Sequence, residues 1–311
     1  EQLNDAFNKS TGDPEAEFDL RTLEISFDRT CNFACSYCNP AFSTTWVKDL
    51  KTHGGYNSLI SDGRNHFTHE HTSSQLYAVG EDNPYVNAFF AWWESDLHRT
   101  LQELRVTGGE PTMSAELWRL VDWFKENANK SQTSLAINSN LGGKRELIDR
   151  LIDARQYLPS LDVYTSCEAV GVPADYIRDG MDWDYWWNNL KDLAQAGVNT
   201  HCMMTVNALC LPTLPDLIFK ILYARQELGK DFAVFSLNIL RFPSFQSCLV
   251  LPQHVKDTCA GRLRGVLNWD LHEFERGQVE RLIEYLRTVQ TPHSDAFEMP
   301  KLHNDLSLIH I

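Results

Sequence analysis

Two periodic patterns of apolar residues alternate along the chain. In residues 21–28 every second residue is apolar (Leu23, Ile25 and Phe27), which predicts a half-buried strand. Elsewhere apolar residues recur every three or four positions, which predicts amphipathic helices. Further strands are expected at 104–107, 134–138, 161–166, 200–207 and 233–240, and helices at 85–104, 114–129, 144–156, 183–196, 214–227 and 273–289.

The order of these elements predicts the class of fold. Strands that alternate with helices are typical of a parallel sheet built from right-handed strand–helix–strand units, and the chain has about six such strands. In these folds the loops that leave the strands converge on one face of the molecule. We therefore expect the functional site at the carboxyl ends of the strands.

The periodic pattern is absent in three places. Residues 1–20 are polar, so we expect an N-terminal tail, followed by a main domain over 21–243. After Pro243 the pattern changes to loops and one helix, which predicts a C-terminal extension over 244–311, truncated at its end. Residues 39–84 show no period. A loop of this length inside a compact domain is often a binding element, so the insertion is expected to be either a lid or surface decoration.

Composition and charge exclude several classes of protein. The 311 residues are 43% hydrophobic and 23% charged, an ordinary globular mixture, and no apolar run approaches the roughly 20 residues that cross a membrane. Lys and Arg number 28 against 42 Asp and Glu, a formal charge of -14. A surface this acidic repels phosphate groups, so we expect neither nucleic-acid nor membrane partners. The eight cysteines do not form a disulfide framework, which favours a reducing cytoplasm.

Three of these cysteines are closely spaced directly after the first strand, as Cys31-x-x-x-Cys35-x-x-Cys38. Thiolates are the ligands of iron–sulfur clusters and of zinc. Three cysteines can hold three irons of a [4Fe–4S] cluster and leave the fourth open, whereas clusters that only transfer electrons are normally closed by four. Structural zinc needs four ligands, and a second cysteine pair is lacking. The spacing therefore favours a cluster that binds and activates a further molecule.

A second motif, Thr107-Gly108-Gly109-Glu110-Pro111, ends the next expected strand. Its two glycines let the backbone approach a ligand, and Glu110 offers a carboxylate to an ammonium group. Together with the cysteine motif and the aromatic Tyr37, this arrangement resembles the radical S-adenosylmethionine (radical SAM) enzymes. The resemblance implies that the cysteines hold the cluster and that the motif around Gly109 and Pro111 binds the methionine amino group of the cofactor.

Weaker matches follow along the chain. Residues Asn138, Ser139 and Asn140 lie where the family contacts the cofactor ribose. Ser166-Cys167-Glu168, followed by Arg178, resembles the Ser-x-Asp-Gly and Arg pattern of the branch with SPASM or twitch extensions, in which Ser and Arg contact the cofactor carboxylate. The chain departs from it with Glu168 for Asp and Ala169 for Gly. Asn207 is a further candidate. Each of these residues is equally well explained as a turn at a strand end. The cofactor-binding candidates are Tyr37, Gly108, Gly109, Glu110, Pro111, Asn138, Ser139, Asn140, Ser166, Arg178 and Asn207.

The resemblance implies a partial (β/α)6 TIM-like barrel, followed here by the mostly helical C-terminal extension. It also implies an enzyme that cleaves S-adenosylmethionine reductively and abstracts hydrogen from a substrate, which we expect to be a peptide or a small molecule. A flavodoxin- or ferredoxin-type protein would donate the electron. The alternative is a non-enzymatic iron–sulfur or zinc-stabilised binding module. Cys248 and Cys259 are too few for a second cluster, and His66, His69 and His71 lack supporting carboxylates.

Overall fold

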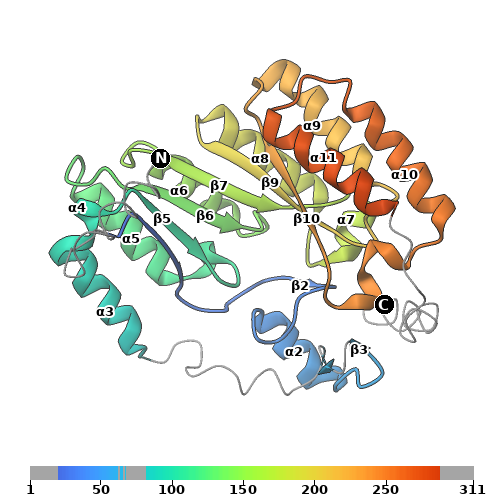
Figure 1. The fold of residues 1–311 in the computed structure, drawn as a ribbon. Coiled ribbons are helices and arrows are strands. Elements are labelled where there is room, and N and C mark those ends of the chain that lie inside the picture. The colour runs from blue at the N-terminus through green and yellow to red at the C-terminus, as the bar shows by residue number, and fades with distance from the viewer. Residues whose placement is uncertain (1–19, 62–63, 66, 68–81, 288–311) are drawn as a thin grey trace, which may run out of the picture.

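The computed structural model describes residues 20–61, 64–65, 67 and 82–287. Its centre is an open sheet of six parallel strands in the order β1-β5-β6-β7-β9-β10, so that each new strand joins the previous one at the same edge (Figure 1). The strands are β1 (Thr22–Ser26), β5 (Glu103–Thr107), β6 (Ser134–Ser139), β7 (Leu161–Ser166), β9 (Asn199–Val206) and β10 (Val234–Ile239).

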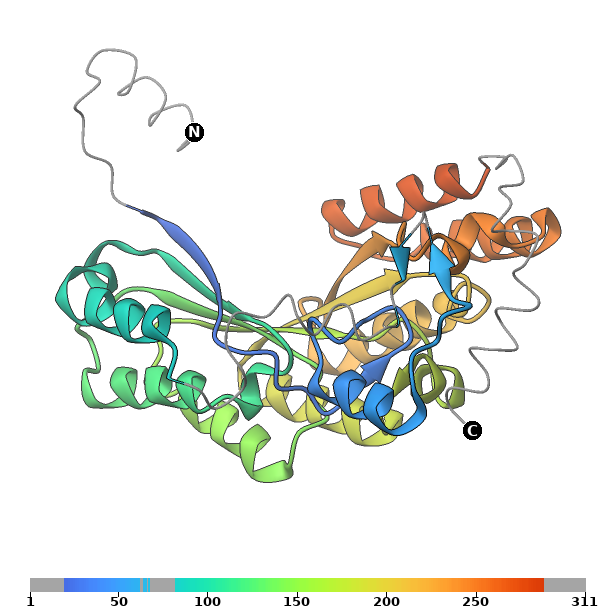
Figure 2. The same ribbon diagram turned by 90° about the horizontal axis from the view of Figure 1, so that it is seen from below.

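The winding of the chain makes this sheet a partial barrel. Because right-handed crossovers proceed in one direction across the sheet, the connecting helices lie on one side of it (Figure 2). The expected α/β partial (β/α)6 barrel is therefore confirmed. The longer helices are α3 (Pro84–Trp92), α5 (Ala115–Glu126), α6 (Arg145–Ala154), α8 (Trp183–Gln195), α9 (Leu214–Leu228), α10 (Gln253–Val266) and α11 (Glu273–Leu286).

The largest apolar cluster, the main core, lies between the sheet and these helices. Strand β7 shows how the sequence builds it, since Leu161 and Val163 are fully buried and alternate with partly exposed polar neighbours. The same alternation continues across the neighbouring strands. The strands contribute Leu104, Val106, Leu135, Ile137, Leu161, Val163, Cys202, Met204, Phe235 and Leu237, and the helices contribute Leu117, Leu120, Ile148, Leu151, Trp186, Leu190, Leu217, Ile221, Leu263 and Val279.

The opposite face of the sheet is polar. Tyr164 on β7 stacks on His201 on β9 with ring centroids 4.2 Å apart, and the Arg105 guanidinium lies 4.2 Å from the Tyr164 ring. His201 Nε2 lies 3.0 Å from Asp162 Oδ1. The strand register places Tyr164 directly opposite His201, so their stack is a cross-strand pair.

The C-terminal helices pack into the same main core and cover the last strand. Helix α10 was not expected, because Lys256, Cys259 and Ala260 occupy its buried stripe and obscure the apolar period. Helix α11 lies along β10: Glu275 accepts a hydrogen bond from Phe235 N at 2.8 Å, and Arg281 donates to Leu237 O at 2.6 Å. These side chains bond backbone groups at the otherwise open edge of β10.

The described half of the 39–84 insertion is more regular than expected. It forms helix α2 (Thr44–His53), capped by Ser43, and a short pairing of β3 (Ile60–Ser61) with β4 (Arg64–Asn65). Five buried residues form a second apolar cluster, the loop core, which comprises Ala34, Trp46, Leu59, Phe67 and Phe245. The expectation that no period holds in this insertion was wrong for α2, where Trp46 and Leu50 are one turn apart and both buried.

Smaller differences concern element ends and short elements. The helix expected over 85–104 ends earlier, because after α3 the chain forms a π-helical turn, η2 (Trp93–Leu97), then α4 (His98–Thr100) and strand β5. A two-residue antiparallel pair, β2 (Ala34–Cys35) with β8 (Arg178–Asp179), has no signal in the sequence. The remaining short helices are η3 (Pro111–Met113), α7 (Val172–Ile177), η4 (Ser244–Gln246) and η5 (Cys248–Val250).

Some expectations lie outside the described residues. These are the N-terminal tail up to residue 19, the histidines at 66, 69 and 71, and the end of the C-terminal extension from residue 288. Whether the insertion is a lid stays a prediction, since most of its second half is not described. Among the described residues, no helix is long and apolar enough to cross a membrane.

Candidate functional site at the carboxyl ends of the strands

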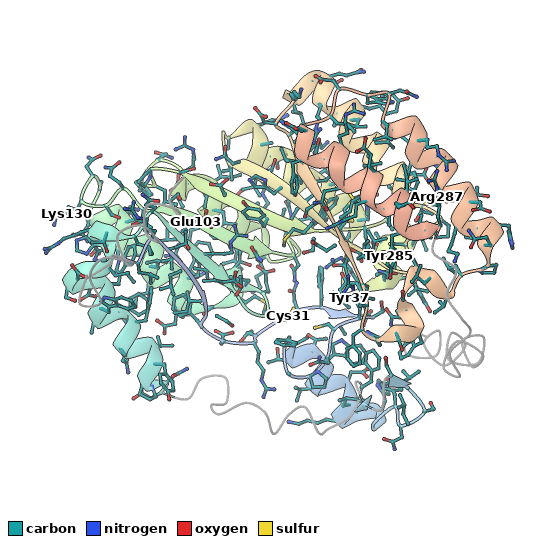
Figure 3. The ribbon with its side chains drawn as sticks, in the orientation of Figure 1. Cys31, Tyr37, Glu103, Lys130, Tyr285 and Arg287 are labelled. Carbon is teal, nitrogen blue, oxygen red and sulfur yellow. The ribbon has the colours of Figure 1, made fainter. Side chains whose placement is uncertain are left out.

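The segment with the three clustered cysteines lies where the carboxyl ends of the strands meet. It leaves β1, passes across the ends of the sheet and leads into α2, so that Cys31 and Tyr37 lie between the sheet and that helix (Figure 3). Cys31, Cys35 and Cys38 are each partly exposed, whereas the other five cysteines are buried. The structure therefore brings this segment to the expected face.

Cys31 is held on both its backbone and its sulfur. Thr44 Oγ1 accepts a hydrogen bond from Cys31 N at 3.1 Å, and Thr45 Oγ1 donates to Cys31 O at 2.7 Å. The sulfur receives N–H groups from Phe33 N at 3.4 Å and Asn140 Nδ2 at 3.8 Å. Since Asn140 follows β6, the predicted ribose-contact segment and the first cysteine are in direct contact.

Cys35 is held by the short β2–β8 pair, in which it lies opposite Arg178. Arg178 Nη1 donates to Cys35 Sγ at 3.7 Å, and Trp46 Nε1 donates to Cys35 O at 3.0 Å. Within the part of the chain that the structure describes, the Cys38 sulfur makes only a local contact, to Asn39 O at 3.7 Å. The three sulfurs therefore have unequal support from the rest of the chain.

The glycine turn packs against the strand-to-cysteine connection. A Cβ added to Gly109 would lie 2.4 Å from Thr30 O and 2.6 Å from the carbonyl carbon of Arg29. Gly108 has a positive φ of 127°, and its added Cβ would lie 2.5 Å from Asp28 O. We expected these glycines to give room to a ligand. The close approach that the structure shows is between two backbone segments of this chain, and the contact of the glycines with a ligand stays a prediction.

Glu110 is buried and hydrogen-bonded within the chain. Its Oε1 accepts from Thr112 Oγ1 at 2.6 Å, Ser139 Oγ at 2.7 Å and Thr112 N at 3.1 Å, while Oε2 accepts from Asn140 N at 2.6 Å. Burial raises the pKa of Glu110, and these hydrogen bonds oppose that rise. The carboxylate thus joins the ends of β5 and β6. Pro111 is also buried and begins the η3 turn.

The remaining candidates differ in what their side chains contact. Asn207 is fully buried, and its Oδ1 accepts from Leu209 N and Cys210 N, so it shapes the turn after β9. Ser166 ends β7 and is partly exposed. Asn138 differs from both, because its Oδ1 is buried and has no hydrogen-bond partner among the described residues. A buried polar atom without a partner is costly, and a bound ligand is one way to satisfy it.

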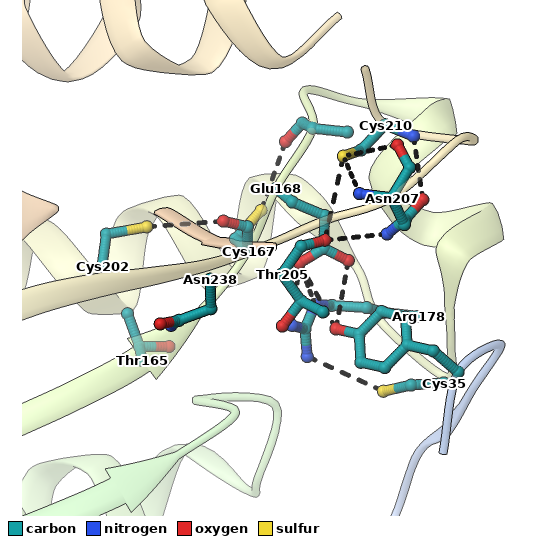
Figure 4. Close-up of polar contacts among 12 residues, drawn as sticks. Cys35, Thr165, Cys167, Glu168, Arg178, Cys202, Thr205, Asn207, Cys210 and Asn238 are labelled. Carbon is teal, nitrogen blue, oxygen red and sulfur yellow. Dashed lines mark hydrogen bonds and ion pairs between the residues drawn. The ribbon is translucent and has the colours of Figure 1, made fainter. Parts of the chain in front are cut away.

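Arg178 lies beside Glu168, the residue that departs from the family pattern (Figure 4), and Tyr37 contacts the same carboxylate. Arg178 donates to Glu168 Oε2 from Nη2 at 2.8 Å and from Nε at 3.1 Å, and Tyr37 Oη donates to Oε1 at 3.2 Å. The side chains of Arg178 and Glu168 are 5% and 1% exposed. Burial lowers the pKa of Arg178, but the facing carboxylate raises it well above its usual value, so the guanidinium stays charged.

The cysteine donor set fits a thiolate-ligated cluster in its chemistry. Two of the sulfurs receive N–H groups, which stabilise thiolates in metal sites. Burial raises the pKa of Cys35 to about 12 against the opposing effect of Arg178, and a bound metal ion would favour the thiolate. Among the described residues, however, no three Cys, His, Asp or Glu side chains are already arranged as metal ligands. The ligand assignment stays a prediction.

Several side chains of the site had no signal in the sequence. Gln246 is buried, and its Nε2 donates to Ser36 O at 2.8 Å, so it joins the C-terminal segment to the cysteine segment. Asn32 donates to Gly142 O at 2.8 Å and accepts from Asn140 Nδ2 at 2.8 Å. The only available signal was the position of Asn32 within the cysteine motif. Gln246 lies 210 residues from its partner, too far for any local pattern.

The comparisons with known proteins concern solved structures. The chain is similar to structures named "Native anSMEcpe with bound AdoMet" (14% identity, TM-score 0.47, 80% of this chain and 59% of that one) and "Native anSMEcpe with bound AdoMet and Cp18Cys peptide" (12% identity, TM-score 0.43, 80% and 59%). It therefore spans about three-fifths of the length of those chains. At such identities the similarity concerns the fold alone. No protein-family model and no curated protein sequence matches the chain.

Proposed function

We propose that this chain is a radical SAM enzyme in which Cys31, Cys35 and Cys38 hold a [4Fe–4S] cluster and the adjacent strand ends bind S-adenosylmethionine. The proposal rests on the order of the cysteine and Gly-Gly-Glu-Pro motifs and on where the chain brings them. When bound, the cluster and cofactor supply one-electron reductive cleavage of S-adenosylmethionine and hydrogen abstraction from a substrate.

One observation carries the proposal. The cysteine segment is anchored to residues that follow two different strands, Asn140 after β6 and Arg178 after β7, through contacts that end on cysteine sulfurs. In parallel α/β folds ligands bind at this end of the strands. N–H groups that face sulfur are what a cluster ligand needs from its surroundings. A loop that served only to connect β1 with α2 would not need them.

The chain's own residues have separable tasks in this proposal. Thr44, Thr45 and Asn140 hold Cys31 in place, and Glu110 joins the turn after β5 to the end of β6. Asn138 offers a buried carbonyl oxygen that has no partner in the described ranges, and such an oxygen can accept a hydrogen bond from a ribose hydroxyl. Contacts within the chain thus already hold Cys31 and Glu110 at the strand ends, whereas Asn138 is left for the cofactor.

The substrate proposal is a peptide or protein side chain. Its support is the resemblance of Ser166-Cys167-Glu168 and Arg178 to the peptide-modifying branch with SPASM or twitch extensions. A small metabolite is the other substrate class. A cytoplasmic location and a flavodoxin- or ferredoxin-type electron donor complete the proposal.

Anaerobic reconstitution with iron and sulfide tests the assignment. Alanine at Cys31, Cys35 or Cys38 should abolish cluster assembly and S-adenosylmethionine cleavage together. Cys167→Ala and Cys202→Ala are matched controls, since both thiols are buried in the main core, and they should retain iron at a packing cost of about 1 kcal/mol. Full iron incorporation in Cys35→Ala would contradict the proposal.

A second candidate is a non-enzymatic iron–sulfur or zinc-stabilised module. The observation that favours it is that Glu110 and Arg178, both expected to bind the cofactor, make hydrogen bonds within the chain. Metal analysis separates the two candidates. Iron with a cluster absorption that responds to S-adenosylmethionine supports the enzyme, whereas one bound zinc without any response supports the module.

A further inference from the structure

The environment of Arg178 differs from what a ligand of the cofactor carboxylate requires. Such a ligand must present its planar fork to the carboxylate of the bound molecule. Here the fork faces Glu168, with two hydrogen bonds to Oε2, and the remaining terminal nitrogen donates to Cys35 Sγ at 3.7 Å. Only 5% of the side chain is exposed. The charge of the guanidinium is therefore balanced inside the protein.

The backbone around Arg178 also holds the middle of the cysteine segment. Arg178 lies opposite Cys35 in the β2–β8 pair, and Ser36 N donates to Ile177 O at 2.8 Å. Tyr37 follows, with its ring centroid 5.5 Å from the Arg178 guanidinium and its hydroxyl on Glu168. Three consecutive residues of the segment, Cys35 to Tyr37, are thus attached to the stretch 168–178 after β7.

We infer that Arg178 is a positioning residue for Cys35, oriented by Glu168 and Tyr37, and not a ligand of the cofactor carboxylate. The inference rests on the proposed function in one respect, which is that Cys35 ligates the cluster. The departure from the family pattern is consistent with it. The longer Glu168 side chain stands where that pattern has Asp, and it reaches both Arg178 and Tyr37.

The arrangement has an electrostatic consequence for the cluster. An N–H group and a positive charge beside a ligand sulfur favour the reduced cluster, which has the more negative charge, and so raise its reduction potential. The buried Glu168 carboxylate partly cancels that effect. Arg178→Gln and Glu168→Gln should therefore shift the potential in opposite directions, Arg178→Gln to more negative values and Glu168→Gln to less negative values. A purely steric clamp would not produce opposite shifts.

Two measurements test the inference, and neither uses substrate turnover. The first is amide hydrogen exchange of the segment 33–38 in the metal-free full chain. Arg178→Gln and Glu168→Gln should each accelerate it by at least about tenfold, because each weakens several charge-assisted hydrogen bonds and one such bond alone corresponds to about that factor. Tyr37→Phe keeps the ring and loses only the contacts of the hydroxyl, so its acceleration should be smaller. The second is the potential of the reconstituted cluster, measured without S-adenosylmethionine.

A matched control separates local from global effects. Arg225 and Glu275 form another buried ion pair, between α9 and α11, with contacts of 2.5 and 2.9 Å. Arg225→Gln should destabilise the chain and leave exchange of 33–38 unchanged below the unfolding transition.

The inference is overturned if Arg178→Gln leaves both exchange and potential at wild-type values while S-adenosylmethionine affinity falls, because that is the behaviour of a cofactor ligand. If the wild-type chain takes up no iron, the proposed function fails. The exchange comparison in the metal-free chain then still decides whether Arg178 positions Cys35.

Discussion

The cysteine segment lies between two apolar clusters that are built in different ways. The main core joins strands and helices whose buried residues recur with the period of their own element, and it extends from β1 to α11. The loop core has five residues, and one of them, Phe245, comes from a segment 178 positions beyond its neighbour Phe67. The main core is therefore encoded locally, whereas the loop core is complete only when the distant segment that carries Phe245 packs against the insertion.

The difference matters because the three cysteines predicted to bind iron do not all pack against the same apolar cluster. Cys31, Cys35 and Tyr37 pack against the main core, whereas Cys38 packs against the loop core. Relative movement of the two clusters would separate Cys38 from the other two cysteines. The spacing of the predicted ligands thus depends on how firmly the smaller cluster is attached.

The largest expected effect comes from removing one fully buried tryptophan from each cluster. Trp186→Ala in the main core should cost about 4 kcal/mol of global stability, measured by denaturant unfolding. Trp46→Ala should cost clearly less, because the sheet does not depend on the loop core. It should instead accelerate hydrogen exchange over residues 34–61 and lower iron uptake. Equal global losses would show that the two clusters unfold as one.

The next effect concerns the junction between the glycine turn and the cysteine segment. Gly109→Ala should cost about 3 kcal/mol, because its Cβ would meet backbone atoms of Arg29 and Thr30 that cannot move without shifting Cys31. Gly261→Ala in α10 is the matched control. Nothing lies within 4 Å of its added Cβ, so it should stabilise the chain by about 0.5–1 kcal/mol. Thermal unfolding gives both values, and a neutral Gly109→Ala would contradict the close packing.

Glu110→Gln tests the attachment on the main-core side. The substitution replaces one carboxylate oxygen, an acceptor, with an amide NH2 group, a donor. That group then faces other donors, either Asn140 N or the hydroxyls of Thr112 and Ser139, and a hydrogen bond is lost. We expect a loss of about 2 kcal/mol in unfolding free energy. The corresponding change on the loop-core side, Ser61→Ala, removes contacts with Ser244 of 2.6 and 2.9 Å and should cost about 1 kcal/mol. If Ser61→Ala cost more stability than Glu110→Gln, the cysteine segment would be attached more firmly on the loop-core side than on the main-core side.

The smallest effect is a pH dependence on the polar face of the sheet. Burial raises the pKa of Asp162, but hydrogen bonds with His201, Asn199 and Ser160 lower it below its usual value. A depressed carboxyl pKa stabilises the fold above the unfolded value of about 3.9, and this contribution is lost as the pH falls through the folded value. Asp162→Asn should therefore be less stable than wild type at pH 6, with the difference shrinking below pH 4. A difference that is constant with pH would contradict this linkage.

Much of the fold was predictable from the chain alone, because the patterns that specify it are local. Strand β7 was expected over 161–166 and spans Leu161–Ser166, and helices α8 and α9 begin at Trp183 and Leu214 as expected. Their apolar periods report which face each element buries, whatever its neighbours are. Helix α10 was missed because its local pattern is weak: Lys256 and Cys259 lie among its buried residues and conceal the apolar period.

The sequence by itself determined the order of the elements, the parallel barrel and the convergence of the cysteine and glycine motifs at the strand ends, because period and chain direction are sufficient for these. Only the tertiary structure decided what the side chains contact there. The bonds of Glu110 to Ser139, of Arg178 to Cys35 and of Gln246 to Ser36 span 29 to 210 residues. Such contacts depend on the packing of elements that are far apart in the sequence, and no local pattern records which polar group a buried charge will meet.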